Sequence, residues 1–255
     1  MKTIFFALLL GLVSCTSKTN TIKLNDLNEL QLKGKVKSVY EYSPGVSKEK
    51  SSDLLLYIFD EQGLLTFQKF ASNDIKESYT YKVENEKVSS SKTFTKRKNK
   101  IKETNSVYHY SKNQCVINTF RNDVLCEKTI KKYDNNNLIS KYSYRYDLKG
   151  KNPYLNYHIK CQYNDKNQLI KYETYLWKYG TKKEFLDWKD EYIYNGQESE
   201  PIIKKVSTFD EFPNKYKHYV FEYSNKYDEK GNWIEKVCFD KNNRSVTKRK
   251  VKYYN

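Results

Sequence analysis

The sequence predicts an all-β fold: an antiparallel sheet of successive hairpins, open or partly rolled, with a short helix near the N-terminus. A turn pattern that recurs along the chain predicts the hairpins. Between the turns, aromatic residues alternate with polar ones, as at Tyr142, Tyr144 and Tyr146, which is the two-residue period of a strand. Composition agrees, because 25 Tyr and 12 Phe favour strands, while 8 Gly and 4 Pro are few for 255 residues. The long apolar strands that a parallel α/β fold requires are not found.

The recurring turn has an aromatic residue, then Asp or Asn, two polar residues, and Gly or Asn before the return strand. The Asp or Asn side chain can accept a hydrogen bond from the backbone two residues on. The fifth residue must adopt a left-handed conformation, which Gly or Asn does at little cost. Each copy therefore predicts one hairpin. The copies cover residues 59–65, 133–139, 146–150, 163–169, 227–234 and 239–244, and the expected left-handed residues are Gly63, Asn137, Gly150, Asn167 and Gly231.

The start of the repeat domain has a different pattern. Leu27 and Leu30 lie three residues apart within residues 24–32, which predicts a short helix that ends at Gly34. Residues 35–42 then predict the first strand. Because single hairpins cannot bury a face alone, the repeats must stack on their neighbours.

The first 15 residues predict export and a lipid anchor. Lys2 and the apolar run 3–13 have the pattern of a secretory signal, and the run is shorter than the about 20 residues that span a bilayer. The residues Leu12, Val13 and Ser14 before Cys15 resemble a bacterial lipobox. The resemblance implies a signal peptide over residues 1–14 and a Cys15 that carries a diacylglycerol thioether and an acylated amine. The alternative is an ordinary secretory signal with a cysteine at its edge by chance.

The residues after Cys15 predict where the anchored chain resides. Residues 15–23 form the lipidated cysteine and a polar tether, and residues 24–255 form the hairpin domain. Position 16 is Thr16 rather than Asp, the residue that signals inner-membrane retention in some lipoproteins, so the outer membrane is favoured. No acidic cluster of the kind that some lipoproteins use for surface export follows Cys15, which favours the periplasmic face.

Charge indicates the class of partner. The chain has 47 Lys+Arg and 31 Asp+Glu, a net charge of +16, and such a surface attracts polyanions. For an exported chain these are anionic glycans and other envelope polymers, and nucleic acid is not an expected partner. An alternative interpretation is that the lysines are simply the solvated faces of strands.

Four cysteines remain after Cys15: Cys115, Cys126, Cys161 and Cys238. An oxidising compartment allows disulfides, but four cysteines permit three connectivities, and buried free thiols are equally consistent with the sequence. A turn at Asn122 and Asp123 places Cys126 opposite position 119, so direct pairing with Cys115 is not expected.

The turns resemble the YD repeat of RHS-like proteins, most closely over residues 227–236 and 247–254. The opening residues 32–39, followed by 59–64, are similar to the start of small gram-negative lipoproteins that are built on this repeat. The resemblance implies an antiparallel sheet of successive hairpins, and carbohydrate binding is a property suggested for such repeats. This chain is too short to form the shell that encloses a toxin in the large relatives, and many small relatives have no assigned activity.

No catalytic constellation is apparent in the sequence. The three histidines have no partner at metal-ligand spacing, and no nucleophile elbow, phosphate loop or dinucleotide fingerprint is present, so neither a metal nor a cofactor is expected. The candidate ligand contacts are Trp177, Tyr179 and Trp188, because exposed aromatic rings beside polar side chains suit sugars or a protein partner. The alternative is that the two tryptophans pack across the sheet.

Three hypotheses on function follow. The preferred one is a non-enzymatic, membrane-anchored repeat module that binds an anionic glycan, another envelope or extracellular polymer, or a protein. The second is a structural or assembly subunit of an envelope complex that pairs through exposed sheet edges. The third is an enzyme that acts on glycan, which needs two carboxylates on opposite sides of a glycosidic bond.

Overall fold

The computed structural model describes residues 30, 32–44, 55–70, 75–85, 87–97, 100–135, 137–178, 183–196, 200–210, 215–240 and 243–255. These residues form sixteen strands. In chain order the strands are β1 (Val36–Tyr42), β2 (Leu55–Phe59), β3 (Leu65–Phe70), β4 (Ile75–Glu84), β5 (Lys87–Arg97), β6 (Lys100–Ser111), β7 (Gln114–Arg121), β8 (Val124–Asp134), β9 (Asn137–Arg145), β10 (Tyr154–Tyr163), β11 (Leu169–Lys178), β12 (Lys183–Ile193), β13 (Ile203–Asp210), β14 (Lys215–Tyr227), β15 (Trp233–Asp240) and β16 (Asn243–Tyr253).

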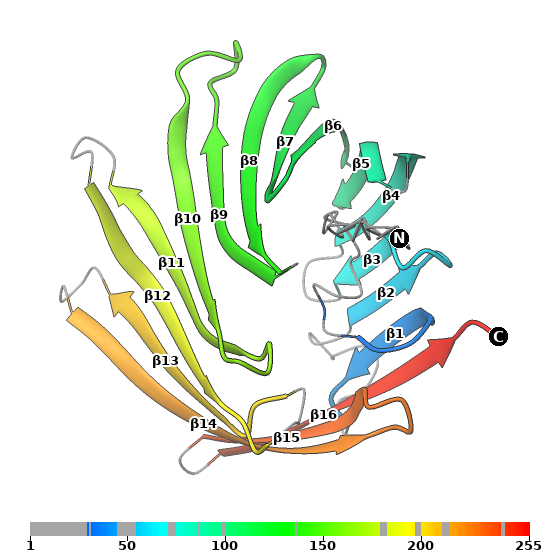
Figure 1. The fold of residues 1–255 in the computed structure, drawn as a ribbon, viewed down its shortest axis with the longest axis vertical. Helices are drawn as coiled ribbons and strands as arrows, with labels where there is room; N and C mark the ends of the chain where they lie inside the picture. The colour runs from blue at the N-terminus through cyan, green and yellow to red at the C-terminus, as the bar shows by residue number, and fades with distance from the viewer. Residues whose placement is uncertain are drawn as a thin grey trace, which may run out of the picture.

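The strands form a closed antiparallel barrel in which each strand pairs with its neighbours in sequence and β1 also pairs with β16 (Figure 1). The prediction of successive antiparallel hairpins is confirmed, but the prediction of an open or partly rolled sheet is wrong. Closure depends on pairs such as Val39 with Val251 and Glu41 with Arg249. No local turn pattern encodes a pairing between residues that lie so far apart in the sequence.

The predicted N-terminal helix is not observed. No helix occurs anywhere in the described part of the chain. Of residues 24–32 only Leu30 and Leu32 are described, and Leu32 is buried in non-helical chain that leads into β1. The described residues also contain no helix that is long and apolar enough to cross a membrane.

Apolar packing holds the two ends of the chain together at the seam between β1 and β16. Val36, Val39 and Phe59 are almost completely buried, and Val39 lies directly between Tyr57 of β2 and Val251 of β16. Complete burial of side chains of this size contributes about 1.5–3 kcal/mol each. The first and last strands therefore share one hydrophobic cluster.

Polar contacts complete the seam. The Asn232 side chain accepts a hydrogen bond from the Lys33 backbone N–H at 2.7 Å and donates to the Lys33 carbonyl at 2.8 Å. It also donates to the Tyr253 hydroxyl at 2.7 Å, and that hydroxyl donates to Asp228. One side chain thus connects the chain before β1, the turn before β15 and the end of β16.

The turns are built largely as their pattern predicts. In the first copy, the Asp60 carboxylate accepts hydrogen bonds from the backbone N–H groups of Gln62 and Leu64, both at 2.9 Å. Asp147, Asn164 and Asp228 make the same pair of bonds in their own turns. Positive φ angles occur at Gly63 (83°), Gly150 (70°), Asn167 (59°) and Gly231 (80°).

Two turns differ from their expected form. In the copy at residues 239–244, β16 begins at Asn243, which pairs with Asp240. The copy at residues 133–139 differs in the same way. Asn137 begins β9 and pairs with Asp134, and the positive φ angle, 46°, falls on Asn135 instead. Asn at both loop positions, 135 and 136, fits a two-residue hairpin loop, so the return strand starts earlier than a five-residue turn allows. The same short connection joins Glu84 to Lys87 around Asn85.

The four cysteines of the hairpin domain are free thiols. Cys115 lies opposite Lys131 and does not face Cys126. The prediction that these two cysteines do not pair directly is confirmed. Burial raises the pKa of the Cys161 thiol to about 11, which keeps this thiol protonated at neutral pH.

Candidate functional site

The tryptophans singled out in the sequence do not form one site. Trp177 lies on β11 opposite Glu184, and Trp188 lies on β12 opposite Thr174. The pairing register of β11 and β12 shifts between Thr174 and Tyr175. One extra residue therefore lies on β12 between the pair that contains Trp177 and the pair that contains Trp188. A bulge of this kind reverses the face to which the following residues belong. Trp177 and Trp188 therefore lie on opposite faces of the sheet, and Tyr179 lies outside the described residues.

Trp188 belongs to a hydrogen-bonded cluster around a buried carboxylate. Its indole N–H donates to Asp190 at 2.7 Å, and the Tyr192 hydroxyl donates to the other Asp190 oxygen at 3.0 Å. The Lys204 ammonium lies 2.9 Å from that oxygen. These bonds compensate for the burial of the Asp190 charge, so they account for the position of Trp188 without a ligand.

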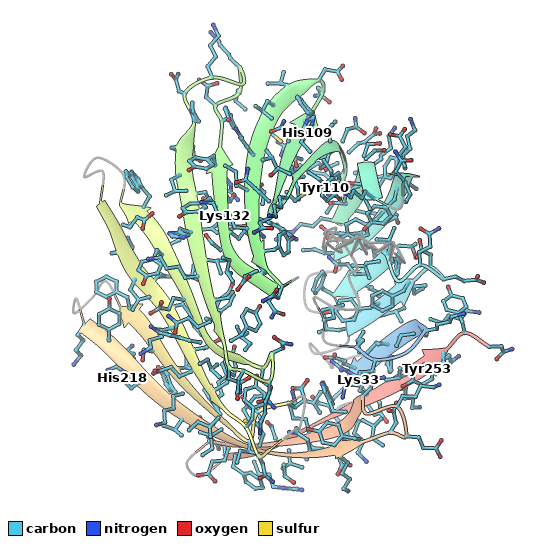
Figure 2. The ribbon with its side chains drawn as sticks, viewed as in Figure 1. Lys33, His109, Tyr110, Lys132, His218 and Tyr253 are labelled. Atoms are coloured by element: carbon cyan, nitrogen blue, oxygen red, sulfur yellow. The ribbon has the colours of Figure 1, made fainter. Side chains whose placement is uncertain are left out.

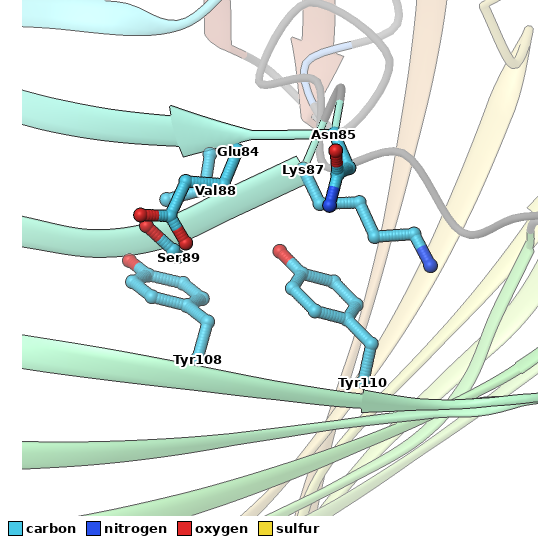
Figure 3. A pocket seen from close by; sticks show the side chains of 7 residues that line it. All are labelled: Glu84, Asn85, Lys87, Val88, Ser89, Tyr108 and Tyr110. Carbon is cyan, nitrogen blue, oxygen red and sulfur yellow. The ribbon is translucent and has the colours of Figure 1, made fainter.

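A cavity of about 440 Å³ lies between the β4–β5 hairpin and β6 (Figure 3). It is an open hollow rather than an enclosed pocket, since Glu84 and Asn85 at its rim are exposed to solvent. The lining residues are Glu84, Asn85, Lys87, Val88, Ser89, Tyr108 and Tyr110.

Two tyrosine rings form one side of this cavity. Tyr108 and Tyr110 are two residues apart on β6, so both point to the same face of the sheet. The Tyr108 hydroxyl is hydrogen-bonded to Ser91 Oγ at 3.0 Å, which fixes its ring. The Tyr110 hydroxyl is buried and, apart from the Cys115 thiol, has no hydrogen-bond partner among the described residues. Burial raises the pKa of Tyr110 well above its ordinary value, so this hydroxyl stays a neutral donor.

Polar groups of the β4–β5 hairpin form the opposite side. The Lys87 ammonium lies 5.4 Å from the centre of the Tyr110 ring, within cation–π distance. Asn85, at the tip of the hairpin, has a left-handed φ of 49° and also lines the cavity. The cavity therefore combines aromatic faces with an amide, an ammonium and a carboxylate.

Glu84 is the carboxylate that lines the cavity, and its chemistry suits binding better than acid catalysis. It forms an ion pair with Lys82 at 2.7 Å, and this hydrogen-bonded ammonium lowers the pKa of Glu84 below its usual value. A carboxylate held ionised can accept hydrogen bonds from sugar hydroxyls but cannot serve as the protonated acid of a glycosidase. The described residues hold no cluster of three or more His, Cys, Asp or Glu side chains that could bind a metal.

Sequence reasoning missed this cavity. In the sequence nothing distinguishes Tyr108 and Tyr110 from the other tyrosines, of which the chain has 25 in all. The two rings share a face of β6, and only the three-dimensional position of the β4–β5 hairpin makes that face one side of a cavity.

No protein-family model matches the chain, and no curated protein sequence matches it. Among solved structures it is similar to a porin-like protein from Bacteroides uniformis, at 10% identity over 85% of this chain and 96% of that chain, with a TM-score of 0.38. It is also similar to a DUF3836 family protein from Parabacteroides distasonis, at 15% identity over 36% of this chain and 85% of that chain, with a TM-score of 0.27.

A further similarity is to the TcdB2–TccC3 structure, at 13% identity over 78% of this chain and 10% of that chain, with a TM-score of 0.35. The chain thus spans a tenth of that protein. Because all three TM-scores lie below 0.5, the function is argued from this chain's own residues.

Proposed function

We propose that the protein is a non-enzymatic glycan-binding barrel of the cell envelope, anchored to the outer membrane through a lipid on Cys15. The observation that carries the proposal is the cavity between the β4–β5 hairpin and β6, where two tyrosine rings face polar groups. Tyrosine presents a flat apolar ring and a hydroxyl together, which suits a sugar ring with its alternating C–H and O–H groups. The YD-repeat resemblance supports the same proposal.

The charge of the chain indicates an acidic glycan. A net charge of +16 concentrates polyanions near the protein, and Lys87 places one ammonium group at the cavity itself. Binding is then expected to weaken as salt is added, because salt screens exposed charges beyond about 10 Å at 0.1 M.

Assembly through exposed sheet edges is not proposed. Pairing of β1 with β16 closes the sheet, and closure removes the lateral edges on which that hypothesis depends.

The test is a glycan screen with the full chain purified in detergent, followed by titration of the best acidic glycan against variants. Tyr110→Ala is expected to weaken binding roughly tenfold or more, because truncation of an aromatic hot spot costs about 2 kcal/mol or more and about 1.4 kcal/mol is tenfold. Tyr154→Ala is the matched control, since Tyr154 is 44% exposed on β10 and does not line the cavity. Equal affinities of the two variants would contradict the proposal.

The anchor has a separate test. Cys15→Ala is expected to abolish metabolic labelling with a fatty-acid probe and to leave the chain unprocessed or soluble. Normal processing and membrane retention of this variant would refute the lipid anchor without affecting the proposal for the cavity.

A further inference from the structure

A row of three side chains crosses β8, β9 and β10 on the face opposite the cavity. Ser140 of β9 lies directly opposite Lys132 of β8 on one side and Lys160 of β10 on the other. Directly paired residues of antiparallel strands share a face, with Cβ atoms about 4.5–5.5 Å apart. Both lysines are exposed and Ser140 is half-buried, so the row is open to solvent. Lys132 is labelled in Figure 2.

The register places this row on the other face from Tyr110. Tyr110 pairs with Cys115, Cys115 with Lys131, and Lys131 with Lys141. Lys131 immediately precedes Lys132 on β8, so their side chains point to opposite faces. The row is therefore a site separate from the tyrosine cavity.

Aromatic rings position the two ammonium groups. In the next row along the same strands, Tyr142, His158 and Tyr175 are paired in register, and the His158 ring stacks on Tyr142 with centroids 3.9 Å apart. The Lys132 ammonium lies 5.6 Å from the Tyr142 ring centre, and the Lys160 ammonium lies 4.4 Å from the Tyr175 ring centre. Both cations thus stand beside the imidazole, one on each side.

His158 orients the hydroxyl between the lysines. Its Nε2 atom lies 3.3 Å from Ser140 Oγ, and its Nδ1 atom lies 3.5 Å from Glu184 Oε2. Burial holds the pKa of His158 below its ordinary value, although Glu184 opposes this shift. The carboxylate is on the Nδ1 side of the ring, so the Nε2 side, with Ser140 and the lysines, is the electropositive side.

The lysines of the row have no carboxylate partner within ion-pair distance among the described residues. Glu173 of β11 lies directly opposite Lys160, but its carboxylate pairs with Lys171 at 2.8 Å. Two strand spacings, about 10 Å, separate Lys132 from Lys160. Their four-carbon side chains can bridge this gap and bring both ammonium groups to a ligand above Ser140.

We propose that Lys132, Ser140 and Lys160 form a binding site for a phosphate or sulfate group. Two ammonium groups provide charge-assisted hydrogen bonds, and the Ser140 hydroxyl, which can rotate, provides a neutral one. The site goes beyond the glycan cavity and does not depend on it, because the two lie on opposite faces.

The test is a titration of the full chain with inorganic phosphate, inorganic sulfate, a sulfated polysaccharide and the matching neutral polysaccharide, followed by the imidazole NMR signals of His158. Lys132→Gln/Lys160→Gln is expected to weaken binding of the charged probes by tenfold or more, since a hydrogen bond to a charged group contributes about 1.5–3 kcal/mol. Lys131→Gln/Lys141→Gln is the matched control, because it removes the same charge from adjacent positions on the opposite face.

The control variant is expected to bind like the parent chain. An equal loss of affinity in both double variants would overturn the proposal, because the effect would then come from the lower net charge and not from the position of the lysines. Binding of the inorganic ions would assign the site to free oxyanions, and binding of the polysaccharide alone would assign it to glycan-borne sulfate; either result supports oxyanion binding. Covalent labelling of Ser140 by a fluorophosphonate would overturn a binding role, because it would identify a nucleophile activated by His158.

Discussion

The polar side chains at the seam between β1 and β16 are more fully paired than Tyr110, Lys132 and Lys160 on the wall formed by β4 to β10. At the seam, Asn232 makes three side-chain hydrogen bonds and Glu41 is paired with Arg249. On the wall, the Tyr110 hydroxyl has no hydrogen-bond partner except the Cys115 thiol among the described residues, and Lys132 and Lys160 lack a carboxylate partner in the described chain. We infer that the seam provides stability, and the proposed function assigns the less fully paired groups of the wall to a ligand.

Removal of the Phe59 ring is expected to have the largest effect on stability. Phe59 is 1% exposed in the apolar cluster of the seam, and Phe→Ala substitutions at such positions typically cost about 3–5 kcal/mol. Denaturant unfolding of Phe59→Ala measures this cost. Phe239→Ala is the control, because Phe239 is 41% exposed on β15. Similar losses in the two variants would show that the seam has no special role.

Truncation of Asn232 is expected to cost about 1–3 kcal/mol, because it removes three hydrogen bonds made by a side chain that is 2% exposed. Asn232→Asp keeps the acceptor for the Lys33 N–H but loses both donated bonds, so it should also destabilise the barrel. Thermal unfolding of the two variants gives the comparison. A melting temperature unchanged in Asn232→Ala would rule out the proposed link between the chain ends.

Gly231→Ala is expected to cost about 1 kcal/mol, because Gly231 has a φ of 80°, which alanine adopts with strain. The nearest atoms to a Cβ added there belong to the Lys33 side chain, with Nζ at 3.2 Å and Cδ at 3.4 Å, and that flexible side chain can move. Gly196→Ala is the control, with a φ of 67° and nothing within 4 Å of the added atom. Nearly equal losses of unfolding free energy are predicted, and a much larger loss at Gly231 would show that Lys33 is rigidly held.

Alkaline pH should loosen the seam. Burial, and then the hydrogen bond to Asp228, raises the pKa of Tyr253 to about 12 from a reference value of 10.0. Since the unfolded chain releases this proton first, the contribution of Tyr253 is intact below pH 10 and is lost as the pH rises through about 12. Across this pH range, the free energy of unfolding should fall less steeply with pH in Tyr253→Phe than in the parent chain. An unchanged pH dependence would exclude a role for this hydroxyl.

The wall lysines should contribute least to stability. Lys132→Gln/Lys160→Gln is expected to change the unfolding free energy by about 1 kcal/mol or less, because the two exposed lysines lose only their contacts with the Tyr142 and Tyr175 rings. The same variant tests oxyanion binding, so a large loss of stability would mean that these lysines hold the sheet together rather than contact a ligand.

The same contrast explains how much could be predicted from the sequence. Each Asp or Asn turn makes its bonds within five residues, so the pattern around Asp60 or Asp228 was sufficient to place a hairpin. Closure pairs Glu41 with Arg249, and no local pattern carries that information. The proposed contact region of Trp177 and Trp188 fails to form because one extra residue on β12 reverses a face, and a strand's alternation does not show such a bulge in advance.

Amide hydrogen exchange, measured by mass spectrometry with and without the acidic glycan from the binding screen, tests most directly whether ligand binds at the wall and not at the seam. We predict slower exchange of the β4–β5 hairpin and β6 when glycan is bound, with exchange of β1, β15 and β16 unchanged. Protection confined to the seam, or spread evenly over all strands, would contradict this account.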